Sequence, residues 1–178
     1  MLRELLRSAW FYDSVNRQTM IKSPVQLIVQ AIRTLDLPAR NLTRLNQACS
    51  VMGQELFMPP SVKGWEGGRK WINTSTLLLR ENTLVYLMTG RDPTAKAWES
   101  NKGGWDARPL VAHLRDLPDR DECHDVVAYL ARLTLGAVPT DARTIRWIEI
   151  AREHGPENND TLIRLLSLMT ASPEYQLC

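Results

Sequence analysis

Apolar residues recur every three or four positions along most of the chain, and this helical periodicity constrains the fold more than any other feature. Its clearest instance starts at Ser23 and Pro24, a capping residue followed by a proline suited to the first turn of a helix. The apolar stripe that follows ends before Pro38 and consists of Val25, Ile28, Val29, Ile32 and Leu35. No alternation of polar and apolar residues is long enough to indicate a strand. The sequence therefore predicts an all-α fold.

Capping side chains, glycines and prolines divide the rest of the chain into further helices and two long loops. Helices are predicted at the chain's start and at 24–35, 41–57, 74–90, 110–117, 119–135, 141–154 and 160–170, with a last turn near Pro173. Together they form an irregular multi-helix bundle of about seven or eight helices. The two long loops, rich in Gly, Pro and Trp, lie at 58–73 and 91–109. We predict one helical domain over 1–178, with layers 1–57 and 74–178 joined by the 58–73 loop.

Composition excludes several classes of protein. The chain has 178 residues, of which 44% are hydrophobic, as expected of a globular domain with a core. A formal net charge of +2 is too small for nucleic-acid binding, and no apolar run is long enough to span a membrane. No nucleotide-binding glycine motif is present, so no cofactor is predicted. The three cysteines, Cys49, Cys123 and Cys178, leave either one disulfide or none open.

The loop within "ELFMPPSVKGWEGGRKWINTSTLLLREN", residues 55–82, has two interpretations. In the structural one, prolines and glycines prescribe the path of the backbone while Trp65 and Trp71 wedge it against helices 24–35 and 74–90. The residues given structural roles are Pro59, Pro60, Gly64, Gly67, Gly68, Arg80 and Glu81. In the functional one, exposed indole rings form a platform for sugars, edged by hydrogen-bond donors. Its candidate binding residues are Lys63, Trp65, Arg69, Trp71, Asn73 and Trp105.

Acidic residues offer weaker candidates for chemistry. Glu81 falls within the apolar face predicted for helix 74–90 from Leu77, Leu78, Leu84, Val85 and Met88. A buried carboxylate there is expected to pair with an arginine such as Arg69, although Glu66 and Glu81 could also be drawn as a glycosidase pair. The acids of 119–125 and His124 could be drawn as a metal site, but Asp119 and Glu122 have the spacing of a helix cap. We predict no metal.

The same loop resembles a bacterial family of unknown function numbered eighteen hundred, as do the flanking "KSPVQLIVQAIRTL" and "MTASPEYQ". The matching positions are Pro59, Pro60, Val62, Gly64, Trp65, Gly67, Gly68, Trp71, Asn73 and Arg80. Glu66 stands where the pattern has proline. The resemblance assigns no activity. It implies the C-terminal part of a longer protein that is usually exported, and hence periplasmic or exported localisation.

From these observations we predict a non-enzymatic helical module of an exported bacterial protein. It is expected to bind a polysaccharide or an envelope partner through the loops around Trp65 and Trp105. The start of the chain lies inside an apolar helical face without a capping residue, so a missing N-terminal part of the same protein is a further expected partner. Two alternatives stay open, a hydrolase that uses Glu66 or Glu81 and a purely structural subdomain of a larger protein.

Overall fold

The computed structural model describes residues 1–38, 40–91, 104–115, 121–139 and 142–178, and within them the fold is all-α, as predicted. Its α-helices are α1 Leu2–Arg7, α2 Pro24–Thr34, α3 Leu42–Val51, α4 Thr74–Thr89, α5 Arg108–Val111, α6 Glu122–Leu135, α7 Ala142–His154 and α8 Asn159–Thr170. Short 3-10 helices occur at Ala9–Tyr12, Ser14–Asn16, Gly68–Trp71, Ala112–Leu114 and Pro173–Gln176. The described residues contain no strand, only an isolated antiparallel bridge between Ile21 and Leu177.

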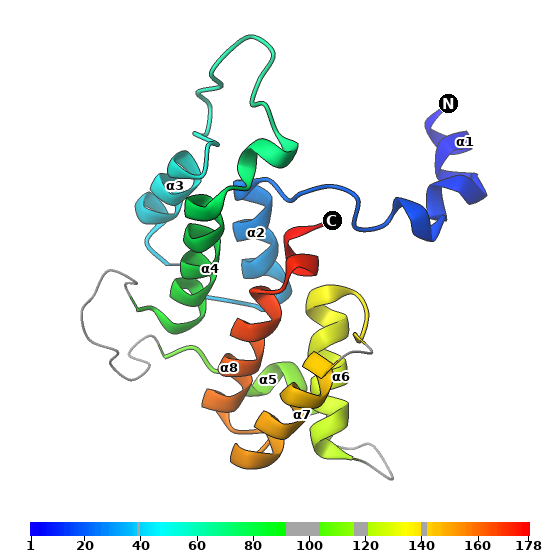
Figure 1. Cartoon of the computed structure of the whole chain (residues 1–178), viewed down its shortest axis with the longest axis vertical. Coiled ribbons are helices and arrows are strands. Elements are labelled where there is room, and N and C mark those ends of the chain that lie inside the picture. The colour runs from blue at the N-terminus through cyan, green and yellow to red at the C-terminus, as the bar shows by residue number, and fades with distance from the viewer. Residues whose placement is uncertain (39, 92–103, 116–120, 140–141) are drawn as a thin grey trace.

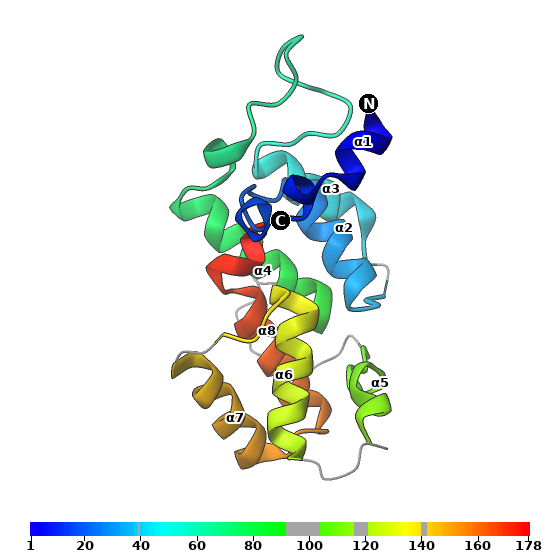
Figure 2. The ribbon, with the colours of Figure 1, turned by 90° about the vertical axis from the view of Figure 1, so that its right-hand side faces the viewer.

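The helices stack in two groups along the long axis of the molecule (Figures 1 and 2). At one end α6, α7 and α8 pack on one another, and at the other α2, α3 and α4 do so. The contact between α4 and α8 joins the two groups. A single apolar cluster runs through both, from Leu27 of α2 through Leu84 of α4 to Leu130 and Leu162 of α6 and α8. No helix of the described residues has the length and hydropathy needed to cross a membrane.

Capping residues set most of the helix boundaries where the sequence predicts them. The Ser23 hydroxyl accepts a hydrogen bond from the Gln26 amide at 3.1 Å, and α2 begins at Pro24. The Asn73 side chain accepts from the Thr76 amide at 2.9 Å, while the Thr76 hydroxyl accepts from the Asn73 amide at 2.9 Å. This reciprocal pair starts α4, which ends at Gly90 in the left-handed conformation.

Three predicted helices have wrong boundaries, and one predicted loop lies largely outside the described residues. The helix predicted at 110–117 is α5, which begins at Arg108 and ends at Val111, before the 3-10 helix Ala112–Leu114. Helix α3 ends at Val51, six residues before the predicted end, because Gly53 turns the chain at a φ of 95°. Helix α6 begins after Asp121, whose carboxylate accepts from the His124 amide at 3.2 Å, so its cap is two residues later than predicted. Most of the predicted 91–109 loop, residues 92–103, lies outside the described part of the chain.

The buried face of α4 differs from the prediction. It carries Arg80, Leu84 and Leu87, whereas Leu77 and Leu78 of the predicted face are 36% and 59% exposed. Glu81 is only half-buried and forms no ion pair with Arg69 or with any other described residue, so the predicted buried pair is wrong. The buried charge of α4 belongs instead to its neighbour in sequence, Arg80, which is 0% exposed.

Arg80 of α4 binds two segments that are distant in the sequence, one containing Lys22 and the other containing Gln176. Its guanidinium donates to the Lys22 carbonyl at 2.7 Å and to the Gln176 side-chain oxygen at 3.1 Å. Lys22 is itself buried, donates from Nζ to the Tyr175 carbonyl at 2.7 Å, and lies 4.0 Å from the centre of the Tyr175 ring. Arg80 and Lys22 thus hold the 20–22 segment against the 175–178 segment, where the isolated bridge forms.

The burial of Lys22 predicts a pH-dependent stability. Burial lowers the pKa of its ammonium group from 10.5 to about 8, so over this range the unfolded chain binds the proton more tightly than the folded chain does. The contribution of Lys22 to the free energy of unfolding should therefore rise by about 2 kcal/mol between about pH 7.5 and 9.5. Urea titrations at several pH values should show this rise in the wild type relative to Lys22→Met.

The difference between the two proteins is the quantity to compare, because other groups titrate nearby. Burial raises the pKa of Cys49 above 9.0 and that of Tyr175 to about 12. The unfolded chain loses these protons first, so both groups lower stability as the pH rises. Cys49 does so in both proteins, and Tyr175, which contacts Lys22, titrates above the range from pH 7.5 to 9.5. A difference that stays constant with pH would contradict a buried ammonium at position 22.

Candidate binding surface

The base of the loop that joins α3 to α4, residues 53–73, is closed by a tryptophan lying between two glycines. A β-carbon placed on Gly53 or on Gly67 would lie 3.7 Å from the Trp71 ring, so the ring contacts both ends of the loop. Gly67 has a φ of 72°, which strains any residue with a β-carbon. The Trp71 carbonyl accepts from the Thr76 hydroxyl at 3.0 Å, which attaches the ring to the start of α4.

Trp65, another residue of this loop, is half-buried, and the nitrogen edge of its indole ring faces the protein. Its Nε1 is shielded from solvent and has no hydrogen-bond partner among the described residues. A nitrogen in that position is not presented to the hydroxyl of an external sugar. Of the other predicted binding residues, Lys63 and Arg69 are exposed, and the Asn73 side chain is occupied in capping α4.

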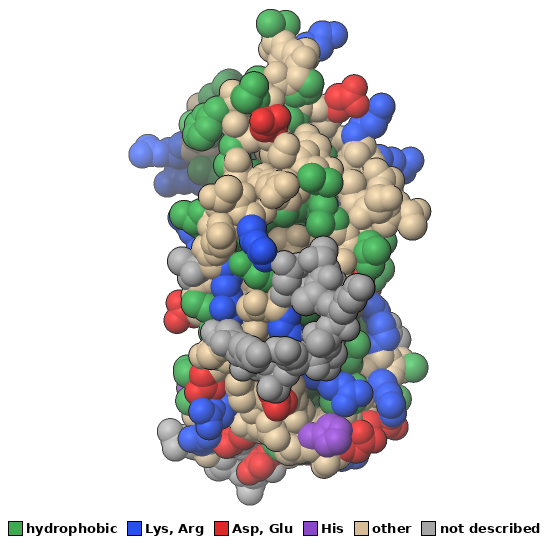
Figure 3. All heavy atoms as spheres, turned by 90° about the vertical axis from the view of Figure 1, so that its left-hand side faces the viewer, with side chains coloured by type: hydrophobic (Ala, Val, Ile, Leu, Met, Phe, Trp, Pro, Cys, Tyr) green, Lys and Arg blue, Asp and Glu red, His purple; other side chains and the backbone are tan. Residues whose placement is uncertain are grey.

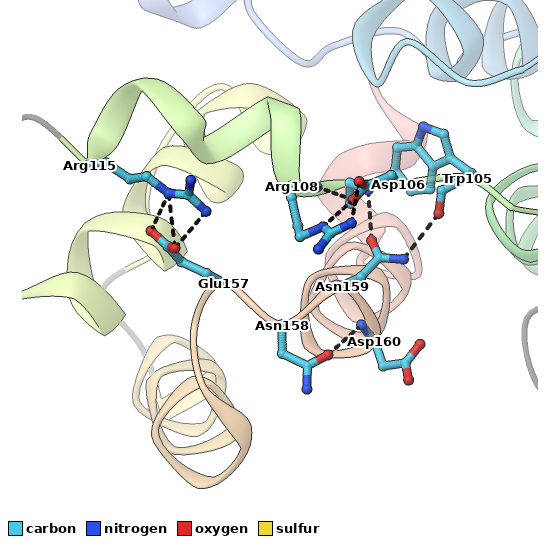
Figure 4. A network of polar contacts seen from close by, with 9 residues as sticks. Trp105, Asp106, Arg108, Arg115, Glu157, Asn158, Asn159 and Asp160 are labelled. Carbon is cyan, nitrogen blue, oxygen red and sulfur yellow. Dashed lines mark hydrogen bonds and ion pairs between the residues drawn. The ribbon is translucent and has the colours of Figure 1, made fainter.

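The prediction that Trp105 lies at the surface is wrong. Its side chain is 7% exposed and belongs to the apolar core. Figure 4 shows how the N-terminus of α8 holds this segment. The Asn159 side chain donates to the Trp105 carbonyl at 3.1 Å and accepts from the Ala107 amide at 2.7 Å. Trp105 therefore offers no stacking face, and its role is packing.

The outer part of the loop exposes large apolar side chains. Phe57 is 93% exposed, Met58 65% and Val62 107%. Figure 3 shows hydrophobic side chains gathered at the end of the molecule that carries this loop. Phe57 also has a φ of 63°, in the left-handed region where a bulky residue is a backbone outlier. Strain of this kind clusters at functional sites, because the surrounding structure must impose it.

Beside Phe57, an apolar groove of about 440 Å³ opens between α2 and α3. Its walls are mainly aliphatic, and Leu56 and Phe57 of the loop belong to its lining. The lining side chains are Val25, Ile28, Val29 and Ile32 of α2 and Leu42, Leu45, Asn46 and Cys49 of α3. The sequence does not predict this groove, because helical periodicity places the whole apolar stripe of α2 in the core. Val29 is in fact 40% exposed and Leu42 is 70% exposed.

The two helices that form the groove carry positive charge and no negative charge. Neither α2 nor α3 contains an acidic residue, and each carries one arginine, Arg33 and Arg44. Asn46 supplies the amide among the lining side chains, and burial raises the pKa of the Cys49 thiol, which keeps it protonated and unreactive. The groove thus suits an apolar ligand with negative charge near Arg33, which follows Val29 by one helical turn on α2.

The carboxylates predicted as alternatives lie elsewhere. Glu66 is exposed and forms an ion pair with Lys70 at 3.2 Å. Glu81 lies on α4, and neither carboxylate lines the groove. The described residues contain no cluster of His, Cys, Asp and Glu able to hold a metal ion. Cys49, Cys123 and Cys178 are free thiols in the structure, and they are buried, half-buried and exposed, respectively.

A family model described as "Protein of unknown function (DUF1800)" matches residues 1–177. No curated protein and no solved structure matches the chain. The comparisons thus provide no catalytic or ligand-binding residue to set beside the groove.

Proposed function

The chain belongs to the DUF1800 family of proteins of unknown function, and we propose that it is a docking module that binds an amphipathic helix of a partner protein. The binding site is the groove between α2 and α3. One observation carries this proposal. Phe57 is held almost fully exposed, in a strained backbone conformation, at the mouth of an apolar groove.

The dimensions of the groove fit a short helix. Its α2 wall extends from Val25 to Ile32, a length of about 10 Å at the rise of an α-helix. Two turns of a partner helix would cover that length and place apolar anchors at i, i+3 or i+4, and i+7 in the groove. Phe57 would then pack against the end of the partner helix.

Charge indicates which kind of helix would bind. With Arg33 one helical turn after Val29 on α2, a helix that lacks acids, a partner with glutamate or aspartate beside its apolar stripe is favoured over a basic one. The contribution is modest and screened by salt, so it directs recognition while apolar burial supplies most of the affinity. In the exported setting that the family resemblance implies, the partner would be an envelope protein.

A polysaccharide is the less favoured ligand. Sugars require several hydrogen-bonding groups around a stacking face, and the groove supplies the amide of Asn46 among aliphatic side chains. The half-buried Trp65 has its nitrogen turned inward, and Trp105 is in the core. These positions support a protein ligand over a sugar.

The proposal can be tested with a fluorescein-labelled synthetic helix that carries leucines at i, i+4 and i+7 and glutamates on both flanks. Fluorescence anisotropy should give a Kd on the order of 10 µM for the wild type. Val29→Glu places a charge in the groove and should weaken binding at least tenfold, or about 1.4 kcal/mol. The matched control is Val51→Glu, since Val51 is 66% exposed on α3 outside the groove.

Three results would contradict the proposal. The first is no binding of the probe helix by the wild type, and the second is equal loss of binding in both variants. The third is glycan-array binding that is abolished by Trp65→Ala and unaffected by Val29→Glu, which would favour the polysaccharide. Circular dichroism of each variant should match that of the wild type.

A further inference from the structure

A second surface, separate from the groove, lies on the N-terminal arm, which we define as residues 1–20. Every residue of this arm except Ser8 is exposed. Leu5 and Leu6 lie one helical turn after Leu2 on α1, and the three side chains are 71% (Leu2), 45% (Leu5) and 47% (Leu6) exposed. Trp10 and Tyr12 follow and are 68% and 62% exposed. The arm is therefore amphipathic and leaves its apolar face uncovered.

The arm lies at the same end of the molecule as the outer part of the loop. Figures 1 and 2 both place α1 and the 53–73 loop at this end, with α6 and α7 toward the opposite one. The loop contributes Met58 and Val62, whose side chains are largely or wholly exposed. Two apolar projections from distant parts of the sequence thus extend from one end of the protein.

This end also carries the net positive charge of the chain. The arm and the loop contain six basic residues, Arg3, Arg7, Arg17, Lys63, Arg69 and Lys70. They contain four acidic residues, Glu4, Asp13, Glu55 and Glu66. The excess of two equals the formal net charge of +2 for all 178 residues, so the rest of the chain is balanced. Lys63 and Arg69 form no ion pair within the described residues.

We infer that this end of the molecule binds the surface of an anionic lipid bilayer. The leucines of α1, with Trp10 and the loop residues Met58 and Val62, enter the headgroup region. The neighbouring arginines and lysines contact lipid phosphates. On α1 the leucines lie on one side and Arg3 and Arg7 on the other, which is the pattern of an interfacial helix, and aromatic side chains such as Trp10 and Tyr12 of the following 3-10 helix favour that depth. Basic residues add attraction to anionic lipids.

A lipid surface accounts for this end better than a second copy of the chain does. Both features are convex projections, and a bilayer can receive two projections at once without a shaped cavity. The groove between α2 and α3 is concave, and its lining excludes the arm and the loop tip at Met58 and Val62. The inference is therefore independent of the proposed helix binding.

The test is sedimentation of the intact chain with sucrose-loaded vesicles. One set contains phosphatidylcholine alone and the other phosphatidylcholine with phosphatidylglycerol. We expect at least tenfold stronger partitioning onto the anionic vesicles, reduced by added salt. Leu6→Gln and Val62→Gln should each reduce partitioning severalfold. The matched control is Ile145→Gln, because Ile145 is 63% exposed on α7 at the opposite end and should leave partitioning unchanged.

Four outcomes would overturn the inference. They are absence of partitioning, equal partitioning onto both kinds of vesicle, equal loss in the Ile145 variant, and a concentration-dependent dimer in light scattering that Leu6→Gln abolishes. The last would show that the arm binds a second copy instead. Val29→Glu should partition like the wild type, so failure of the helix-binding test would not affect this one.

Discussion

Replacing Arg80 by alanine should lower the free energy of unfolding by about 3–5 kcal/mol, the largest loss expected from any single substitution in this chain. The side chain is 0% exposed and makes hydrogen bonds to the Lys22 carbonyl and the Gln176 side chain. Its removal leaves both acceptors buried and unsatisfied and opens a large cavity. Burial lowers the pKa of Arg80 to about 10, so loss of the buried charge recovers part of the desolvation cost. The loss of bonds and packing exceeds that gain.

Urea denaturation measures this effect directly. Arg164→Ala is the matched control, because Arg164 is an exposed arginine on α8 and its removal should change stability by no more than about 0.5 kcal/mol. Arg80→Lys should also destabilise the protein, since an ammonium group cannot reach both acceptors in the geometry of a guanidinium fork. An Arg80→Ala protein as stable as the wild type would show that the segments at 20–22 and 175–178 are held by other contacts.

Replacing Trp71 by alanine should give the second largest loss, about 2–3 kcal/mol. The estimate is lower than for a fully buried tryptophan because the ring is half-buried. The ring packs against Gly53 and Gly67, so its removal separates the two ends of the loop as well as reducing apolar burial. Amide hydrogen exchange should therefore become faster throughout residues 54–70. In α6 and α8, exchange should change only by the amount that the lower global stability accounts for.

Trp10→Ala is the control for the loss of an indole ring, since Trp10 is 68% exposed on the N-terminal arm. It should change neither stability nor exchange in the loop. If Trp71→Ala destabilises the protein but exchange in the loop stays at its wild-type rate, the ring contributes to the core alone and does not close the loop.

Local signals in the sequence were sufficient to predict the helical class and most helix boundaries. Ser23 and Asn73 cap helices through contacts with residues three positions away, and Gly90 and Gly136 end helices in the left-handed conformation. Each of these effects depends on a few neighbouring residues, so each can be recognised in the chain. The structural interpretation of Gly67 rests on the same kind of signal, its left-handed φ of 72°.

The parts that could not be predicted depend on contacts between distant segments. The face of α4 that is buried was assigned from apolar spacing, but Arg80 is buried because its partners come from residues 22 and 176. Trp105 looked like a surface residue in a turn-rich segment, and the Asn159 side chain fixes that segment over the core. Helical periodicity identifies an apolar stripe without showing which part of it the next helix covers.

The candidate site likewise has one part that local sequence signals predict and another that depends on contacts between helices. The loop motif predicts that residues 58–73 follow a fixed path, and the Trp71 ring packs against Gly53 and Gly67 of the loop. The groove was not visible, because it exists only where α2 and α3 fail to cover each other's apolar residues. The sequence does not predict the exposure of Phe57, because it predicts a helix over 41–57 whose last residue is Phe57. It lies instead in the loop beyond the end of α3.

An amphipathic helix bound between α2 and α3 beside Phe57 should be visible by methyl NMR at the level of single residues. The spectra would follow isoleucine, leucine and valine methyl groups during titration with the glutamate-flanked probe helix. We predict saturable shifts at Ile28, Val29, Ile32, Leu42 and Leu45, and none at Ile145 or Leu168, which are exposed at a distance from the groove. Shifts that are absent from the groove, or spread equally over exposed methyl groups throughout the molecule, would contradict the claim.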